Sequence, residues 1–253
     1  MTEGTELFQK RLTELADRAR ERGVYAYTDF LSLHELAVLA GMRGALTGAA
    51  PETFGGAEGC ERKMARFGSE ALCGYEEPFP IACVEVRPRS DKFADALTHR
   101  DFLGALLNLG VAREAMGDIF VHENAGYVFC KRAIAPFLVE NLARVKRTSV
   151  RCAAVDAPPA AAAVRLAPQT LQVAGERLDG VIAKAYRLAR EESAELFTQG
   201  RVFINGAPCP KGSASPRPGD VVSVRGHGRF IYRGPAGLTK KGRLNVVIEK
   251  YET

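Results

Sequence analysis

The residues best suited to do chemistry lie in one segment near the C-terminus, residues 223–244 (SVRGHGRFIYRGPAGLTKKGRL). No Asp or Glu occurs between Asp220 and Glu249, and five glycines are interspersed among the cations. The cations of this basic segment are Arg225, Arg229, Arg233, Lys240, Lys241 and Arg243. A guanidinium group offers paired donors to phosphate and a flat face to a base, and glycine lets a backbone approach a phosphate closely. The segment therefore predicts binding to a polyanion.

The charge of the whole chain is unevenly distributed in the same direction. From Arg165 onward, 15 Lys and Arg face 8 Asp and Glu, whereas the preceding residues carry 20 against 22. Such asymmetry is typical of a nucleic-acid-binding module in the basic part. The alternative is a surface charged for solubility. It is less favoured, because solubility calls for mixed signs, and a long run of cations without an acid repels itself.

The two aromatic residues of the basic segment leave two alternatives open. Phe230 and Tyr232 could stack on unpaired bases. They also alternate with Ile231, which is the spacing of a strand that turns one side toward a core.

Composition limits the class of protein. A chain of 253 residues, 46% of them hydrophobic, is long enough for about two domains. Its six cysteines include no C-x-x-C pair, so we expect reduced thiols and no metal site. Neither a signal-peptide core nor an apolar run of membrane-spanning length is present. We therefore expect a cytoplasmic protein that has no cofactor and no membrane contact and is monomeric when free.

The elements that must position these residues fall into three segments. Residues 1–44 read as helical, and LSLHEL contains a capping box formed by Ser32 and Glu35. Residues 45–160 predict a strand at 80–86, a helix at 98–110, a hairpin turning at Asn124–Gly126, a helix at 135–145 and a strand at 149–155. That order is typical of the ferredoxin-like (RRM-like) αβ plait, which RNA-binding and unrelated proteins share.

The stretch DAPPAAAA (156–163) predicts a linker, and residues 165–253 a further small domain. Its first helix has one apolar face, formed by Leu178, Val181, Ile182 and Ala185. Residues 202–206 and 221–224 read as strands. The predicted fold class is therefore α+β, with N-terminal helices, the plait and this C-terminal domain.

The C-terminal domain resembles the S4 RNA-binding domain over about 60 residues. The matching motifs are Arg177-Leu178-Asp179, Ala189-Arg190, the run GRVFING at 200–206, and Gly219-Asp220. Ala189 departs from the helix-capping serine that is usual in the family, a change that costs about 1 kcal/mol. The resemblance implies that Arg177, Lys184, Arg187, Arg190 and Arg201 face RNA together with the basic segment. The alternative is that they are ordinary surface cations. Asp179 and Asp220 are more consistent with capping or turn roles.

Three further stretches extend the resemblance to YlmH-type S4 proteins over nearly the whole chain. They are FGGAEGCERKMARF (54–67), HRDFLGALLNLGVAREAMGDIFV (99–121) and SVRGHGRFIYRGPAGLTKKGRLNVVIEKY (223–251). Ala57 and Cys60 depart from the Tyr and Ala that are more usual in the first. The resemblance implies binding to rRNA, and to tRNA, on the large ribosomal subunit when translation stalls.

Other residues of these stretches have more than one interpretation. Glu61, Arg62, Lys63 and Arg66 could touch RNA, or belong to a glycine-rich turn entering a helix. Arg100 and Arg113 fit helix-surface or turn positions better than RNA contacts.

Catalysis is not expected. The run GRLN (242–245) is similar to the catalytic Gly-Arg-Leu-Asp of pseudouridine synthases, but the acid is replaced by Asn245, and eight residues after it leave no room for a catalytic barrel. No phosphate-binding glycine loop occurs, and the four histidines stand in different segments. Two alternatives remain: an RNA-modifying enzyme, and an interaction protein of the cell-division machinery.

Overall fold

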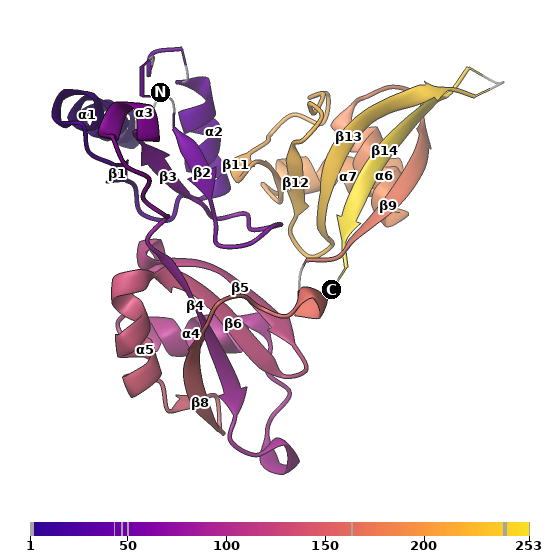
Figure 1. The fold of residues 1–253 in the computed structure, drawn as a ribbon. Coiled ribbons are helices and arrows are strands. Elements are labelled where there is room, and N and C mark those ends of the chain that lie inside the picture. Colours follow the sequence, from indigo (N-terminus) through magenta and orange to yellow (C-terminus); the bar gives the residue numbers. More distant parts are fainter. Residues whose placement is uncertain are drawn as a thin grey trace. The chain divides into compact units, whose positions relative to one another are not determined.

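The computed structural model describes residues 3–42, 44–46, 48–49, 51–162, 164–239 and 242–252. The chain forms two compact units, Met1–Ala163 and Val164–Thr253 (Figure 1). Both units combine helices with antiparallel sheets, so the chain is an α+β protein that begins with a long helix. In the part of the chain described, every helix is too short or too polar to span a bilayer.

The first unit opens with a helical and a small β layer. Its elements are α1 (Glu3–Arg22), β1 (Ala26–Tyr27), α2 (Leu33–Gly41), β2 (Glu52–Phe54), β3 (Met64–Phe67) and α3 (Glu70–Cys73). The expected capping box starts α2: the Glu35 carboxylate accepts the Ser32 N–H (2.7 Å), and Ser32 Oγ accepts the Glu35 N–H (3.3 Å). The sheet order is β1-β3-β2, so the domain boundary expected after residue 44 falls between strands of one sheet.

One interpretation had the glycine-rich stretch 54–63 entering a helix, but the stretch leads into the strand β3. β3 pairs with β1 through Ala26 and Phe67 and with β2 through Phe54 and Met64. Ala65 and Phe67 are buried against Leu12 and neighbouring residues of α1. Burial of Ala65 and Phe67, together with strand pairing on both sides, outweighs the intrinsic helix propensity of Met64, Ala65 and Arg66.

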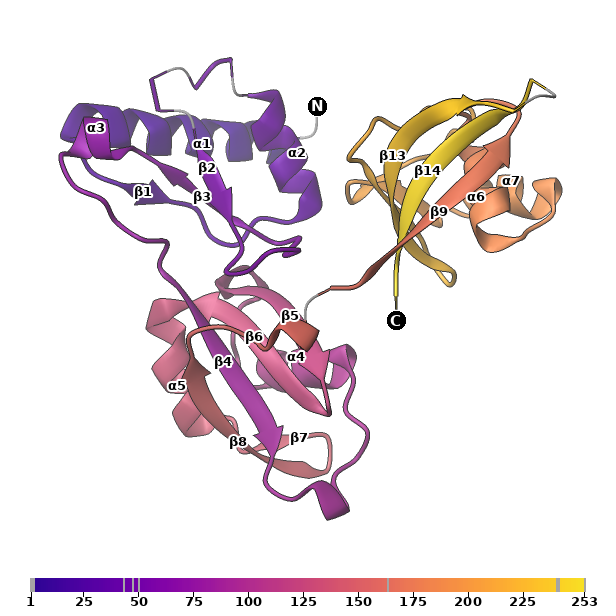
Figure 2. The same ribbon diagram turned by 45° about the vertical axis from the view of Figure 1, so that its right-hand side comes forward.

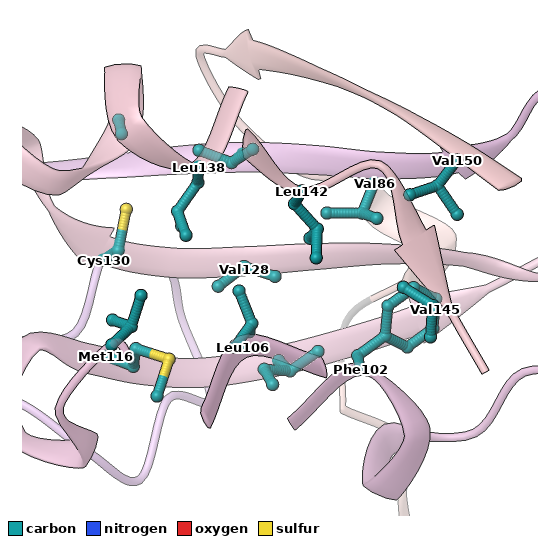
Figure 3. Close-up of a cluster of buried hydrophobic side chains, with 14 of the residues drawn as sticks. Val86, Phe102, Leu106, Met116, Val128, Cys130, Leu138, Leu142, Val145 and Val150 are labelled. Carbon is teal, nitrogen blue, oxygen red and sulfur yellow. The ribbon is translucent and has the colours of Figure 1, made fainter. Parts of the chain in front are cut away.

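The rest of the first unit follows the order strand, helix, strand, strand, helix, strand. Its elements are β4 (Ile81–Pro88), η1 (Asp91–Phe93), α4 (His99–Asn108), η2 (Arg113–Ala115), β5 (Met116–His122), β6 (Ala125–Lys131), η3 (Arg132–Ile134), α5 (Ala135–Asn141), β7 (Arg144–Val145), β8 (Thr148–Val155) and η4 (Ala160–Ala162). The sheet order is β5-β6-β4-β8-β7. Helices α4 and α5 cover one face, where Phe102, Leu106 and Leu138 pack on Val86 and Val128 (Figure 3).

Two boundaries differ from the sequence expectation. The β5–β6 turn is formed by Glu123 and Asn124, whose φ angles are 46° and 63°, while Ala125 begins β6. A two-residue turn of this left-handed kind matches the twist of the paired strands. The predicted second helix ends at Asn141, and residues 144–145 instead form β7, which pairs with β8. Within the expected linker, η4 forms a short helical turn with Ala162 buried.

The second unit is a six-stranded antiparallel sheet with two helices (Figure 2). Its elements are β9 (Leu166–Val173), α6 (Leu178–Tyr186), α7 (Arg190–Thr198), β10 (Val202–Ile204), β11 (Ala207–Pro208), β12 (Val221–Val224), β13 (Gly228–Leu238) and β14 (Leu244–Tyr251). The strand order is β11-β10-β12-β13-β14-β9. Most of the described part of the basic segment forms β13, in the middle of the sheet. Strand β9, which pairs with β14 along its whole length, was not anticipated.

Candidate nucleic-acid interface

The basic segment has two sides because β13 is a strand. Phe230 and Tyr232 are both fully buried in the core beneath α6 and α7, so the stacking role considered for them is wrong. The Tyr232 hydroxyl donates to the Glu176 carboxylate (2.6 Å), and burial raises the pKa of Tyr232. Their neighbours Arg229 and Arg233 are exposed. Alternation along the strand thus places the aromatic residues inside and the arginines on the opposite face.

Five of the predicted RNA-facing residues line one hollow, which we call the basic pocket. It has a volume of about 540 Å³ and lies among α6, the start of α7 and the ends of β9 and β14. Its cationic lining residues are Arg177, Lys184, Arg187, Arg190 and Arg243. The acid in its lining is Asp179. These cations come from positions between 177 and 243 of the sequence, so the pocket exists only in the folded unit.

Local backbone geometry brings these side chains together. Arg187 ends α6 in the left-handed conformation (φ 56°, ψ 42°), and α7 begins three residues later at Arg190. The short turn keeps the end of one helix beside the start of the next. Arg243 is distant from the other pocket cations in the sequence. It lies beside the end of β9 because the next residue, Leu244, is the first of β14 and pairs with Val173 at the end of β9.

Arg177 differs from the other four cations. Its Nε and Nη2 donate to the two carboxylate oxygens of Asp179, at 3.2 and 2.6 Å. Asp179 also accepts the Gly180 N–H at 2.7 Å, and its pKa is lowered, chiefly by the Arg177 hydrogen bond. This pair fixes the start of α6, as expected for Asp179. Lys184, Arg187, Arg190 and Arg243 are exposed, and among the described residues none of them has a carboxylate within 4.0 Å.

A second group of cations lies away from the pocket. The Arg225 guanidinium lies 4.5 Å from the Phe203 ring centroid, and that of Arg229 lies 4.6 Å from the ring of Tyr251. Phe203 and Tyr251 are partly exposed. Stacking on the Phe203 ring leaves the edge of the Arg225 guanidinium available to phosphate. Phe203 was missed as a platform, although its alternation with Val202 and Ile204 is visible in the sequence.

The remaining residues that were predicted to face RNA either make contacts within the second unit or are not among the described residues. Arg201 donates through Nε and Nη2 to the Arg225 carbonyl (3.1 and 2.6 Å), which joins the end of α7 to the end of β12. Arg233 pairs with Glu249 at 2.7 Å. Lys240 and Lys241 lie outside the described residues.

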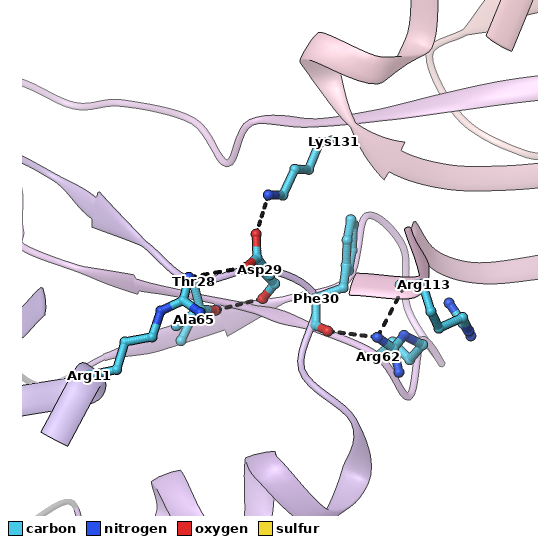
Figure 4. Close-up of polar contacts among 8 residues, drawn as sticks. All are labelled: Arg11, Thr28, Asp29, Phe30, Arg62, Ala65, Arg113 and Lys131. Atoms are coloured by element: carbon cyan, nitrogen blue, oxygen red, sulfur yellow. Dashed lines mark hydrogen bonds and ion pairs between the residues drawn. The ribbon is translucent and has the colours of Figure 1, made fainter. Parts of the chain in front are cut away.

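In the first unit, the arginines of the 54–67 stretch have structural contacts. Arg62 Nη2 donates to the Phe30 carbonyl (2.7 Å) (Figure 4). Its Nε donates to the Met116 carbonyl (3.1 Å), so Arg62 ties the segment before α2 to β5. Asp118 accepts the backbone N–H groups of Glu61 and Arg62, and burial raises its pKa.

The other cations near this stretch also contact protein groups. Asp29 pairs with Lys131 of β6 and with Arg11 of α1 (3.1 Å) (Figure 4). Arg113 donates to the Met116 and Gly117 carbonyls, the turn role expected for it. Arg66 pairs with Glu52 and lies 4.9 Å from the Phe79 ring. These contacts give each of the cations named here a structural role that does not require RNA.

The six cysteines are free thiols. Burial raises the pKa of Cys60, Cys83 and Cys130 to about 12 in each case. Across the described residues, no three His, Cys, Asp or Glu side chains gather into a metal-binding cluster.

The chain is similar to proteins with an RNA-binding domain. A family model described as "Putative RNA-binding domain in YlmH" matches residues 75–158. The ribosome-associated protein quality control protein P2 of Bacillus subtilis (strain 168) is 32% identical over 229 residues, covering 88% of this chain and 86% of that protein. The solved structure of the cell division protein ylmH from Streptococcus pneumoniae covers 61% of this chain and 93% of its own, at 20% identity and a TM-score of 0.48. Identity at this level with the Bacillus protein, along nearly the full length of both chains, reflects common descent. The chain therefore belongs to the YlmH family.

Proposed function

We propose that this protein binds rRNA and tRNA on the large ribosomal subunit, in the cytoplasm, and acts in translation quality control when ribosomes stall. The second unit then serves as an S4 RNA-binding domain. Residues 75–158 serve as an RRM-like plait that forms a second RNA-binding module. The proposal is supported by the name of the Bacillus relative and by the family model over residues 75–158.

The observation that carries the proposal is the charge of the basic pocket. Lys184, Arg187, Arg190 and Arg243 converge there, and the one carboxylate among the described residues of its lining, Asp179, is already bound by Arg177. Because these four cations have no ion-pair partner among the described residues, they repel one another. A phosphate backbone entering the pocket removes that repulsion and releases its own counterions to solution.

The pocket favours binding over catalysis. Asp179 is the acid that could act as a base there, but both of its oxygens accept hydrogen bonds from Arg177, and its pKa is lowered. A carboxylate so stabilised is a weak base. The RNA-modifying alternative is tested by mass spectrometry of rRNA from a deletion strain, where a missing modification would overturn the non-enzymatic assignment.

The salt dependence of RNA binding tests the pocket directly. A variant with Lys184→Gln, Arg190→Gln and Arg243→Gln removes three pocket cations; Arg187 stays, because its left-handed backbone also affects folding. Each lost phosphate contact flattens the slope of log K against log salt by about 0.7 to 0.9. We expect a slope flatter by about two with purified large-subunit rRNA.

The matched control removes three other exposed cations of the same unit, by Arg165→Gln, Lys211→Gln and Arg217→Gln. Its slope should change by less than half a unit, because these residues lie outside the pocket. Equal slopes in the two variants would mean that only net charge matters. Co-sedimentation with ribosomes separates the ribosomal role from one in cell division: a protein that never sediments with ribosomes is not acting there.

A further inference from the structure

In the plait of the first unit, the sheet face on which bases would be expected to stack is covered. Tyr127 and Phe129 of the inner strand β6 alternate with Val128 and Cys130, which face α4 and α5, and so point to the other side of the sheet, yet both are buried. Gly56 lies against Phe129 so closely that a Cβ on Gly56 would stand 2.3 Å from Phe129 Cδ1. Stacking modules need such aromatic residues to be open to solvent. RNA contacts of this unit must therefore come from another surface.

A basic run lies elsewhere in the same unit. Between Glu140 and Asp156 there is no acid, although the first unit as a whole has slightly more acids than bases. The run contains Arg144, Lys146, Arg147 and Arg151. The first three lie on the β7–β8 hairpin and are all exposed.

The hairpin is held firmly to the unit. Val145 and Thr148, which alternate with the cations, are buried, and Val145 joins the core beside Phe102 (Figure 3). Asp95 accepts the Arg147 N–H (3.3 Å) and donates its own N–H to Thr148 Oγ1 (2.9 Å). Cations on a fixed backbone lose less conformational freedom on binding than those on a loose loop.

Beside the hairpin runs a groove of about 540 Å³ along α4 and the end of α5. Arg100, Arg144 and Lys146 line it, together with the amides of Asn108 and Asn141. The acid in the lining is Asp101, whose Oδ2 accepts both the N–H and the hydroxyl of Thr98, at 2.9 and 2.7 Å. Its Oδ1 lies 3.8 Å from Lys146 Nζ, so it offsets one cation and leaves two.

We propose that the plait binds RNA through this hairpin groove and not through its sheet face. Phosphates pair with Arg144, Lys146 and Arg147, and Asn108 and Asn141 offer hydrogen bonds to ribose or base edges. The inference rests on the proposed RNA-binding function and names a second surface for it. RNA fits the groove better than an acidic protein does, because amides and cations line it and the aromatic anchors typical of protein hot spots are absent from its described lining.

The test uses the full chain and purified large-subunit rRNA. A variant with Arg144→Gln, Lys146→Gln and Arg147→Gln should flatten the salt slope by about two, at about 0.7 to 0.9 per contact. Restoring charge with Arg144→Lys and Arg147→Lys should keep the wild-type slope. The control Lys10→Gln, Arg18→Gln and Arg22→Gln removes three exposed cations of α1 and should leave the slope within half a unit. Crosslinked peptides should include residues 142–151.

The outcomes separate this inference from the proposed function. A hairpin variant with an unchanged slope, beside a pocket variant with a flattened one, overturns the hairpin groove alone. The reverse pattern overturns the pocket and leaves the groove standing. A hairpin variant that keeps its RNA slope but no longer sediments with ribosomes would mean that the hairpin contacts a ribosomal protein, which also overturns the inference. Equal melting temperatures of the variants exclude misfolding as the cause.

Discussion

Replacing Phe230 by Ala separates a core role from an RNA-stacking role at one position. Phe230 is fully buried, and its ring lies 6.2 Å from that of Tyr186 in the core of the second unit. Removing a buried phenyl ring costs about 3 to 5 kcal/mol, because the transfer free energy is lost and a cavity remains. In a unit of this size, each kcal/mol lowers the melting temperature by about 4 to 8 °C.

We therefore expect the unfolding transition of the second unit to move down by more than about 12 °C in Phe230→Ala. Differential scanning calorimetry of the full chain measures it, and RNA affinity is measured well below the lowered transition. Affinity there should stay within a few-fold of wild type, because the ring does not reach the surface.

Phe203→Ala is the matched control. Phe203 is an aromatic residue of the same sheet, but it is partly exposed and lies under the Arg225 guanidinium. Its loss should lower the melting temperature less and RNA affinity more than the loss of Phe230. A small thermal shift in Phe230→Ala together with a large loss of RNA affinity would refute the two-sided description of β13.

Two further predictions concern positions outside the cations. The pKa of Asp179 is lowered in the folded state, chiefly by Arg177, so its carboxylate stabilises the fold above its unfolded pKa of about 3.9, and this stability is lost as the pH falls through the lower folded value. Asp179→Asn should thus lower the melting temperature at pH 7, with the difference from wild type shrinking below about pH 4; a difference independent of pH would contradict the pairing. Gly56→Ala should destabilise the first unit strongly, because φ is +105° and the new Cβ would meet Phe129, whereas Gly110→Ala (φ +85°, open space) should cost only about 1 to 2 kcal/mol. Chemical denaturation of both variants checks this, and equal losses would show that the glycine-rich stretch does not cover the sheet.

Local signals in the sequence were sufficient for many elements. The capping box of Ser32 and Glu35, the cap of α4 at Thr98 and the apolar face of α6 each depend on residues three or four apart, so the sequence predicts them directly. The uneven charge and the motifs around Arg177 and Gly200 predict that the second unit binds RNA, and this stays a prediction.

Other features depend on residues far apart in the chain. Whether Phe230 stacks or packs could not be decided from alternation, since a strand has two sides and only the position of α6 and α7 determines which is buried. The roles of Arg62 and Arg66 needed partners in Phe30, Met116 and Glu52. The basic pocket needed β14 to pair with β9, which brings Arg243 to Arg187 and Arg190. Spacing along the chain predicts the faces of helices and strands, but strand order and packing decide which faces meet, because those depend on the burial of the whole unit.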